Sequence, residues 1–317
     1  MITGKKRRGI CCGSSTDMIN YNSASALRTF LEQEGLRMQK KFGQNFLINP
    51  AVKISLVEAL GCDDEVWEIG PGLGVMTALL LEKGLTVRAF EIDRGFIRVL
   101  KELFSCYEKF TLVEGDVLKT WKTQKQAQFL LGNLPYNIAA VLTAELIENS
   151  CLFERMVITV QKEVALRMAA PPGSPDYSSL SVLCASVYKV KPLMTIHPSS
   201  FYPQPNVDSM GILFEKKKEV SYPDLFYPLV RALFASRRKT IRNNLLNFIS
   251  SVSQSKNREI CELILLESGL NGNERAEKLE MEVFLSIAKS IEKCENINKD
   301  VNSGKHNTGR RKDTKSL

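Results

Sequence analysis

Residues 132–136, Gly-Asn-Leu-Pro-Tyr, follow a short apolar run and combine a side-chain acceptor, a proline and an aromatic ring. This combination suits the alkylation of an exocyclic amine, a poor nucleophile because its lone pair is delocalised into the base. The Asn133 side-chain oxygen and the Leu134 carbonyl can each accept one N–H of such an amine. Pro135 disfavours a helical conformation at the residue before it, and Tyr136 offers a ring for base stacking. The alternative for these residues alone is an ordinary turn between a strand and a helix.

A second candidate site lies upstream, where a predicted strand over residues 65–69 leads into the turn Gly-Pro-Gly-Leu-Gly at 70–74. A helical pattern over residues 76–83 follows, so the three elements begin a βαβ unit. The next predicted strand carries Glu91, 17 residues past the last glycine. An acidic residue at that position accepts hydrogen bonds from ribose hydroxyls.

Two classes of cofactor fit this pattern, a dinucleotide and S-adenosylmethionine. The glycines are spaced G-x-G-x-G, which differs from the G-x-G-x-x-G of dinucleotide sites. Glu68 precedes them, and a carboxylate there suits a cationic ligand group better than a pyrophosphate. Asp116 ends a predicted strand over residues 110–113 and can accept from an adenine amino group. The glycine turn, Glu91, Asp116 and Asn133 end four successive strands, whose carboxyl ends meet at the ligand-binding edge of an open α/β sheet. This ordered set favours S-adenosylmethionine.

Composition limits the class of protein. The chain has 317 residues, enough for about two domains, and 44% are hydrophobic. Its net charge of +8 indicates a polyanionic partner such as nucleic acid. It lacks a run of about 18 apolar residues, and its polar start differs from a signal peptide, so we expect no membrane span and a cytoplasmic location. Two histidines and no C-x-x-C pair argue against a metal site. No feature demands a second subunit, and we expect a monomer.

Periodicity and composition divide the chain into four predicted segments. They are a flexible basic extension over residues 1–20, a catalytic domain over 21–217, a helical RNA-binding domain over 218–295 and a disordered tail over 296–317. Alternating strands and helices from about residue 50 to 165 predict a Rossmann-like α/β domain with a parallel sheet covered on both faces. Strands near residues 193–196 and 209–214 are expected to close this sheet as an antiparallel pair.

An aromatic loop late in the predicted catalytic domain is a candidate substrate contact. Two prolines stiffen residues 199–205 and can present Phe201 as a flat surface on which an extruded base lies against Tyr136. Stacking of this kind contributes roughly 1–3 kcal/mol per base. The alternative, a core anchor, is equally consistent with Phe201 alone.

A basic run in the predicted helical domain is a candidate phosphate contact. Residues 236–242 include Arg237, Arg238, Lys239 and Arg242, and we predict that they open a helix with a basic edge. Such an edge binds phosphates with strong salt dependence. The alternative is a solvated helix face.

These motifs together resemble the ribosomal RNA adenine N6-dimethyltransferase family, in particular its bacterial small-subunit (16S) members, over about residues 25–285. The resemblance is carried by residues 41–47 (Lys-Phe-Gly-Gln-Asn-Phe-Leu), 68–72 (Glu-Ile-Gly-Pro-Gly), 91–93 (Glu-Ile-Asp), 133–136 (Asn-Leu-Pro-Tyr), 161–164 (Gln-Lys-Glu-Val), 201–205 (Phe-Tyr-Pro-Gln-Pro), 237–243 (Arg-Arg-Lys-Thr-Ile-Arg-Asn) and 275–277 (Arg-Ala-Glu). One departure is Asn206, where the family often has lysine.

The resemblance implies that S-adenosyl-L-methionine is the methyl donor, and we expect no metal. It implies cofactor contacts at Asn45, Leu47, Gly70, Glu91, Asp116 and Asn133, of which Asn45 and Leu47 rest on the resemblance alone. Gly72, in the glycine turn, is a further predicted cofactor contact. The resemblance further implies N6,N6-dimethylation of two adjacent adenosines in the 3′-terminal hairpin loop of 16S rRNA, within an immature small ribosomal subunit. Two alternatives stay open: a large-subunit rRNA methyltransferase of the macrolide-resistance type, and a non-catalytic RNA-binding assembly factor.

Overall fold

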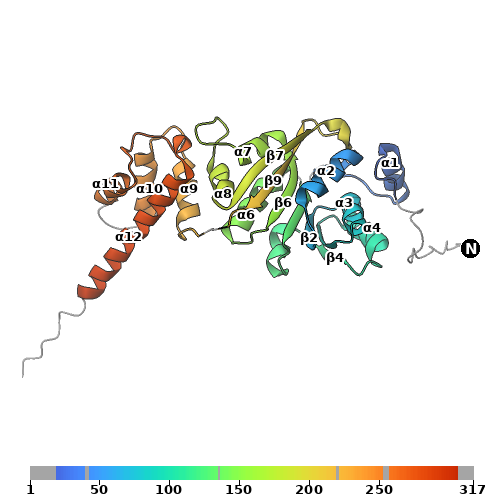
Figure 1. Cartoon of the computed structure of the whole chain (residues 1–317), viewed down its shortest axis with the longest axis horizontal. Helices are drawn as coiled ribbons and strands as arrows, with labels where there is room; N and C mark the ends of the chain where they lie inside the picture. Colours follow the sequence, from blue (N-terminus) through green and yellow to red (C-terminus); the bar gives the residue numbers. More distant parts are fainter. Residues whose placement is uncertain (1–18, 40–42, 135, 219–220, 253–256, 306–317) are drawn as a thin grey trace, which may run out of the picture. The chain divides into compact units, whose positions relative to one another are not determined.

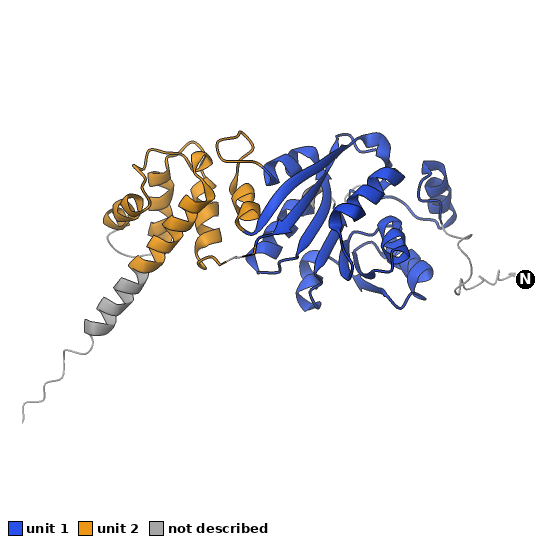
Figure 2. Ribbon diagram, viewed as in Figure 1, with its two compact units in different colours: residues 1–169, 187–217 blue, residues 170–186, 218–317 orange. Residues whose placement is uncertain are grey.

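The structure is a computed structural model of the chain and describes residues 19–39, 43–134, 136–218, 221–252 and 257–305 (Figure 1). The chain divides into two compact units, residues 1–169 with 187–217 and residues 170–186 with 218–317 (Figure 2). Residues 170–186, which the sequence-based division places in the catalytic domain, therefore cluster with the helical unit. This grouping has a structural reason, because Tyr177 Oη donates to Leu279 O and Gly173 N donates to Glu277 O.

Five parallel strands form one part of the seven-stranded sheet of the first unit. They are β2 (Glu65–Ile69), β3 (Thr86–Glu91), β4 (Phe110–Glu114), β5 (Phe129–Asn133) and β6 (Arg155–Gln161). Val66, Val87 and Leu130 are at most 1% exposed, as expected for strands covered on both faces. The predicted strand over residues 65–69 matches β2, and the one predicted over residues 110–113 matches β4 except for its last residue.

Helices alternate with these strands. They are α1 (Ala24–Gln33), α2 (Pro50–Leu60), α3 (Val75–Glu82), α4 (Arg94–Phe104), α5 (Val117–Thr120), α6 (Tyr136–Glu148) and α7 (Lys162–Met168). Local sequence explains several of their starts. The Asn49 side chain accepts from Val52 N at the start of α2, where Pro50 occupies the first turn. The Asp93 side chain likewise accepts from Gly95 N and Phe96 N at the start of α4.

The strand order is β4-β3-β2-β5-β6-β9-β7. From β2 the chain first extends the sheet through β3 and β4, and it then returns to place β5 on the other side of β2. The direction of winding therefore changes between β2 and β5. In open α/β sheets, ligands bind outside the carboxyl ends of the strands at such a switch point. The glycine turn follows β2 and Asn133 ends β5, so both lie at this point.

Two antiparallel strands complete the sheet, as the sequence predicts. β9 (Ser209–Lys216) pairs with β6, and β7 (Tyr188–Ile196) pairs with β9 through an irregularity between Pro192 and Met194. β7 begins five residues before the predicted start. Its first half carries Lys189 and Lys191, and this edge-strand polarity hides it from a hydrophobic pattern.

A second, two-stranded sheet joins two motifs that are far apart in the sequence. β1 (Phe46–Leu47) pairs antiparallel with β8 (Phe201–Tyr202), and Ile48 N donates to Ser200 O over 2.8 Å. Elements of two residues have no periodicity, so the sequence does not predict them. The pairing holds the predicted cofactor segment around Asn45 against the proline loop.

The segment before β1 packs against the glycine turn. Tyr21 Oη donates to Leu73 O over 2.9 Å, within that turn. Lys53, only 6% exposed, donates from Nζ to Asn22 Oδ1 over 2.6 Å, and burial lowers the pKa of its ammonium group. α1 buries Leu27 and Leu31 in a cluster with Leu73, Val75 and Phe96.

The second unit is helical, as expected. Its helices are α8 (Ser179–Val187), α9 (Phe226–Phe234), α10 (Ile241–Val252), α11 (Asn257–Glu267) and α12 (Met281–Lys305). Its core includes Leu229, Ile241, Leu245, Ile264 and Phe284, each 0% exposed. Ile241, Leu245 and Phe248 share the buried face of α10, as the helical spacing predicts.

Two boundaries in this unit differ from the prediction. The basic run does not open a helix: residues 236–240 form a turn, and α10 begins at Ile241, whose N–H donates to Glu274 O over 2.7 Å. At the other end, α12 continues to Lys305, into the segment predicted to be disordered. Every helix in the described part of the chain is too short or too polar to cross a membrane.

Candidate active site

The turn between β2 and α3 requires glycine. Gly70, Gly72 and Gly74 have φ angles of 71°, 59° and 84°, which residues with a side chain rarely adopt. A Cβ atom at Gly72 would lie 2.8 Å from the Phe46 ring, and one at Gly74 would lie 2.3 Å from the Phe104 ring. The turn is thus packed so closely that larger residues do not fit at these positions.

A cavity of about 270 Å³ opens beside this turn. Its lining includes all seven residues for which the sequence predicts cofactor contacts: Asn45, Leu47, Gly70, Gly72, Glu91, Asp116 and Asn133. Glu68 and the apolar Phe90 and Ile138 also line it. A mostly apolar cavity with a few converging polar groups is the usual form of a cofactor site. The structure brings the seven residues together, and the contact that each makes with a cofactor remains a prediction.

Glu91 holds the end of β3 to the glycine turn. Its Oε2 accepts from Gly72 N over 3.0 Å, and its Oε1 accepts from Ile92 N and Asp93 N over 2.9 and 2.8 Å. Burial raises its pKa to about 7, opposed by these three hydrogen bonds. Each carboxylate oxygen carries two lone-pair sites, so the group can still accept a hydroxyl at the cavity wall.

Glu68 is a second buried carboxyl at the cavity. It is 2% exposed, and Thr77 Oγ1 donates to its Oε2 over 2.6 Å. Burial raises its pKa to about 7, a larger effect than the opposing hydrogen bond from Thr77. A carboxyl whose pKa lies near neutral pH, beside an apolar cavity, can become charged when a cation binds.

Asp116 follows β4 and caps the short helix α5. Its Oδ1 accepts from Leu118 N over 3.0 Å. This contact fixes the side chain at the cavity wall while its other oxygen retains acceptor capacity. An adenine amino group is the ligand donor that the sequence predicts for it.

The Asn133 side chain has a defined orientation. Its Nδ2 donates to the backbone carbonyl of Asn45 over 2.8 Å. This hydrogen bond assigns the amide nitrogen to the Asn45 side, so the side-chain oxygen remains available as an acceptor. Leu134 is 3% exposed and donates from its N–H to Thr159 O over 3.1 Å, which ties the motif to β6. Pro135 lies outside the described residues, as does the side chain of Tyr136, whose backbone begins α6.

Two glutamines without a predicted role, Gln39 and Gln44, anchor the segment before β1. Gln39 Nε2 and Gln44 Nε2 both donate to Asp93 Oδ2, over 2.8 and 2.9 Å, and Gln44 Oε1 accepts from Gln39 N over 2.8 Å. Asp93 is only 5% exposed. The partners are 54 and 49 residues apart. A single sequence carries no signal for such long-range side-chain pairs, and only the motifs at 41–47 and 91–93 hint at them.

Phe201 lies in the hydrophobic core. Its ring is 2% exposed and belongs to the same buried cluster as Leu47, Leu56 and Leu213. The structure therefore favours the core-anchor alternative over the stacking surface. The reason is the β1–β8 pairing, which sets Phe201 opposite Leu47 and turns its ring inward.

The four predicted phosphate-binding cations of the helical unit are not equivalent. Arg242 is paired with Glu262 and donates from Nη2 to Asn271 O over 2.6 Å. Arg237 is likewise engaged within the unit. Arg238 and Lys239 are exposed, and their side chains have no ion pair or hydrogen bond to another described residue. The predicted basic helical edge joining Arg238 and Arg242 does not form, because the helix begins after Arg238.

A family model and similar named proteins indicate the same family for this chain. A family model described as "Ribosomal RNA adenine dimethylase" matches residues 35–293. A protein named "Ribosomal RNA small subunit methyltransferase A" from Treponema denticola is 47% identical over 283 residues, which cover 86% of this chain and 96% of that protein. The protein of the same name from Borreliella burgdorferi is 37% identical over 86% of this chain and 95% of its own.

Solved structures agree. A dimethyladenosine transferase from Plasmodium falciparum is 27% identical with a TM-score of 0.68, covering 77% of this chain and 96% of that one. The 23S rRNA methyltransferase ErmE is 21% identical with a TM-score of 0.57, over 78% of this chain and 99% of that one. The second similarity concerns the fold alone.

Proposed function

The chain belongs to the ribosomal RNA adenine dimethylase family and is an S-adenosylmethionine-dependent rRNA adenine dimethyltransferase; we propose that it dimethylates N6 of two adjacent adenosines in the 3′-terminal hairpin loop of 16S rRNA. The substrate is an immature small ribosomal subunit, and the enzyme acts in its biogenesis as a cytoplasmic monomer. The names of the similar proteins from Treponema denticola and Borreliella burgdorferi support the small-subunit assignment.

The cavity fits S-adenosylmethionine in the chemistry of its donors and acceptors. Glu91 accepts the ribose hydroxyls, and Asp116 accepts the adenine amino group. Gly70 and Gly72 allow close approach of the backbone, while Asn45 and Leu47 close the cavity from the β1 side. Buried Glu68 offers a negative charge for the cationic part of the cofactor. When bound, S-adenosylmethionine supplies the activated methyl group that the reaction transfers.

The observation that carries the proposed chemistry is the orientation of Asn133. Because its amide nitrogen donates to Asn45 O, its oxygen can accept from the adenine N6 amine. The Leu134 carbonyl accepts the second N–H, and Tyr136 stacks on the base. Two acceptors on one amine increase electron density on its nitrogen and hold it in place for attack. Catalysis is then mainly orientation. No general base is required beforehand, because the amine becomes acidic once it is alkylated.

The helical unit supplies contacts to RNA phosphates. Arg237, Arg238, Lys239 and Arg242 form the basic part of this unit. We assign RNA binding to its residues 218–295 and catalysis to the first unit. Most of the proposed phosphate contact falls to Arg238 and Lys239, and this assignment is supported by the lack of a partner for their charges among the described residues.

Methyl transfer to defined RNAs tests the proposal. The protein is incubated with labelled S-adenosylmethionine and either unmethylated small ribosomal subunits or protein-free large-subunit RNA. Label on the 3′-terminal hairpin of 16S rRNA is expected. Label on large-subunit RNA alone would assign the chain to the macrolide-resistance type. Cofactor binding without label on either RNA would indicate an assembly factor.

A further inference from the structure

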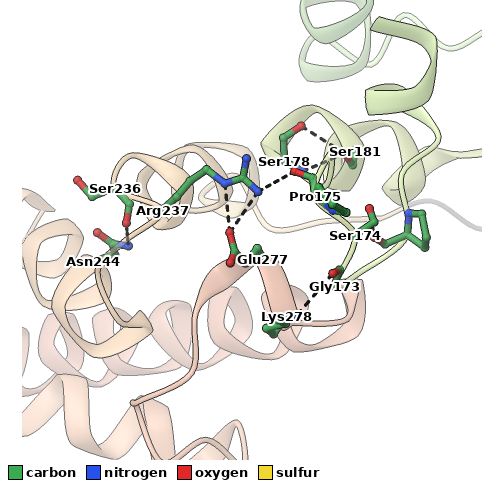
Figure 3. A network of polar contacts seen from close by, with 11 residues as sticks. Gly173, Ser174, Pro175, Ser178, Ser181, Ser236, Arg237, Asn244, Glu277 and Lys278 are labelled. Atoms are coloured by element: carbon green, nitrogen blue, oxygen red, sulfur yellow. Dashed lines mark hydrogen bonds and ion pairs between the residues drawn. The ribbon is translucent and has the colours of Figure 1, made fainter. Parts of the chain in front are cut away.

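Two motifs that are distant in the sequence meet in the helical unit. Arg237 belongs to the basic run, and Glu277 belongs to the Arg-Ala-Glu element. Arg237 Nε and Nη2 approach Glu277 Oε2 at 3.2 and 3.1 Å (Figure 3). The side chains are 47% and 24% exposed. The carboxylate is thus partly buried beneath the guanidinium.

The same guanidinium reaches a third segment, the 171–178 loop. Arg237 Nη2 donates to Pro175 O over 3.0 Å (Figure 3). The loop also contacts the backbone of Glu277 directly, because Gly173 N donates to Glu277 O over 2.8 Å. Lys278 Nζ adds a longer contact of 3.4 Å to Gly173 O. Arg237 therefore bridges the loop and the Arg-Ala-Glu element, which lie 62 and 40 residues away in sequence.

Two buried side chains, Tyr177 and Asn244, hold the segments on either side of this bridge in place through hydrogen bonds. Tyr177, 2% exposed, donates from Oη to Leu279 O over 3.1 Å, and its ring packs edge-on against Phe234. Asn244, 3% exposed, donates from Nδ2 to Leu233 O and Ser236 O over 2.9 and 3.2 Å. The turn over residues 236–240, here called the basic turn, is therefore held by Asn244 on one side and by Arg237 on the other.

The basic turn presents two cations that no described residue neutralises. Arg238 and Lys239 follow Arg237 directly, are exposed, and have no partner among the described residues. A phosphate can pair with either of them without displacing a carboxylate. For Arg237, a phosphate must compete with Glu277 for the same N–H groups.

We propose that Arg237 is a positioning residue: its bridge to Glu277 and Pro175 fixes the basic turn, so that Arg238 and Lys239 make the phosphate contacts. This inference rests on the proposed RNA-binding function of the unit. It also gives the Arg-Ala-Glu element a role, because Glu277 holds the bridge. Fixing the turn beforehand removes an ordering cost from RNA binding.

The test measures binding of the full chain to unmethylated small ribosomal subunits at several KCl concentrations and constant Mg²⁺. The variants are Arg237→Ala, the charge swap Arg237→Glu with Glu277→Arg, and Arg238→Ala with Lys239→Ala. Arg258→Ala is the matched control, because Arg258 is an exposed arginine of the same unit with no ion pair to another described residue. Melting temperatures report on folding.

The slope of log K against log salt is negative, and removing one cation that pairs with a phosphate lowers its magnitude by about 0.7–0.9. The double variant of Arg238 and Lys239 should lower it by roughly twice that amount. Arg237→Ala should raise Kd about three- to fivefold, as for an exposed ion pair, with an unchanged slope. The charge swap rebuilds the ion pair but not the donation to Pro175 O, so it should recover part of the lost affinity. Arg258→Ala should change neither quantity.

If Arg237→Ala lowered the magnitude of the slope by the amount expected for one phosphate contact, and the swap did not rescue it, Arg237 would be a phosphate ligand. That result would overturn the proposal. Unchanged Kd in Arg237→Ala with a lower melting temperature would also overturn it, since the bridge would then serve folding alone. An unchanged slope in the Arg238 and Lys239 variant would instead reject the RNA-binding role of the basic turn, and the inference with it.

Discussion

The side-chain amide of Asn133 donates to the backbone carbonyl of Asn45 over 2.8 Å, joining residues 88 positions apart. Asn45 precedes β1, and Asn133 ends β5 at the point where the winding of the sheet changes direction. The contact leaves the Asn133 oxygen as an acceptor at the cavity. A residue of the proposed cofactor-binding segment thus orients the residue that we propose to hold the substrate amine.

Asn133→Ala is expected to reduce the rate of methyl transfer at least 100-fold, because the variant has no side-chain acceptor to orient the amine, an effect comparable with removal of a preorganised hydrogen bond. RNA affinity should stay near wild type. Single-turnover methylation and subunit binding measure the two quantities. Asn149→Ala is the matched control, since Asn149 is an exposed asparagine that donates to Glu145 O at the end of α6. Near-normal turnover in Asn133→Ala would refute the assigned role.

The buried Glu68 predicts an unusual pH dependence of stability. Burial raises its pKa from 4.5 to about 7 in the folded chain. Between these values the folded state holds a proton that the unfolded state has lost, so the free energy of unfolding falls as pH rises from about 4.5 to 7. The loss contributed by this group is about 2–3 kcal/mol. Cofactor affinity should change in the opposite direction, because a cationic ligand favours the ionised carboxylate.

Glu68→Gln isolates this contribution, since Gln keeps an acceptor for Thr77 Oγ1 but has no charge. Chemical unfolding of the cofactor-free protein at pH 5, 6, 7 and 8 should show the variant gaining stability relative to wild type as pH rises. Its cofactor affinity should be weaker and less dependent on pH. Parallel stability curves for the two proteins would show that Glu68 does not titrate in this range.

Gly74→Ala should destabilise the chain more than Gly84→Ala, although both glycines have a left-handed backbone, with φ of 84° and 79°. Each substitution incurs about 1–2 kcal/mol of backbone strain. At Gly74 the new Cβ would also lie 2.3 Å from Phe104, whereas nothing lies within 4 Å at Gly84. Overpacking adds about 1–3 kcal/mol. Urea unfolding measures the difference, and equal losses of stability would mean that the Phe104 contact carries no cost.

Gln44→Leu should weaken cofactor binding and also lower kcat. The change removes one of the two glutamine donors to buried Asp93 and so loosens the segment whose Asn45 carbonyl orients Asn133. Steady-state kinetics with varied S-adenosylmethionine give KM and kcat, and calorimetry gives cofactor affinity. Gln126→Leu is the control, because Gln126 is an exposed glutamine that donates to Leu152 O elsewhere in the unit. A raised KM with unchanged kcat would separate Gln44 from the orientation of Asn133.

Local patterns predict the parallel strands and the residues at their ends. Each strand is a short apolar run bounded by glycine or acidic residues, and parallel strands place their carboxyl ends at one edge. Gly70, Glu91, Asp116 and Asn133 therefore meet at one cavity, as expected. Asn45 and Leu47 precede the alternating region, and only the family resemblance brings them to it.

Tertiary contacts decide what the sequence does not predict. Phe201 becomes a core residue because β8 pairs with β1, a register that no local pattern encodes. The start of α10 depends on Glu274 and Asn244, which cap the basic turn from outside its own sequence. The bridge from Arg237 to Glu277 likewise joins motifs that the sequence presents as independent.

Mass spectrometry of 16S rRNA after reaction tests the central claim most directly. Unmethylated small subunits are treated with the wild-type protein and S-adenosylmethionine, and nuclease fragments of the 3′-terminal hairpin are then weighed. The account predicts N6,N6-dimethyladenosine at two adjacent positions, and an unmodified hairpin with Asn133→Ala. Products that stop at one methyl group per adenosine, or modification elsewhere in the RNA, would contradict it.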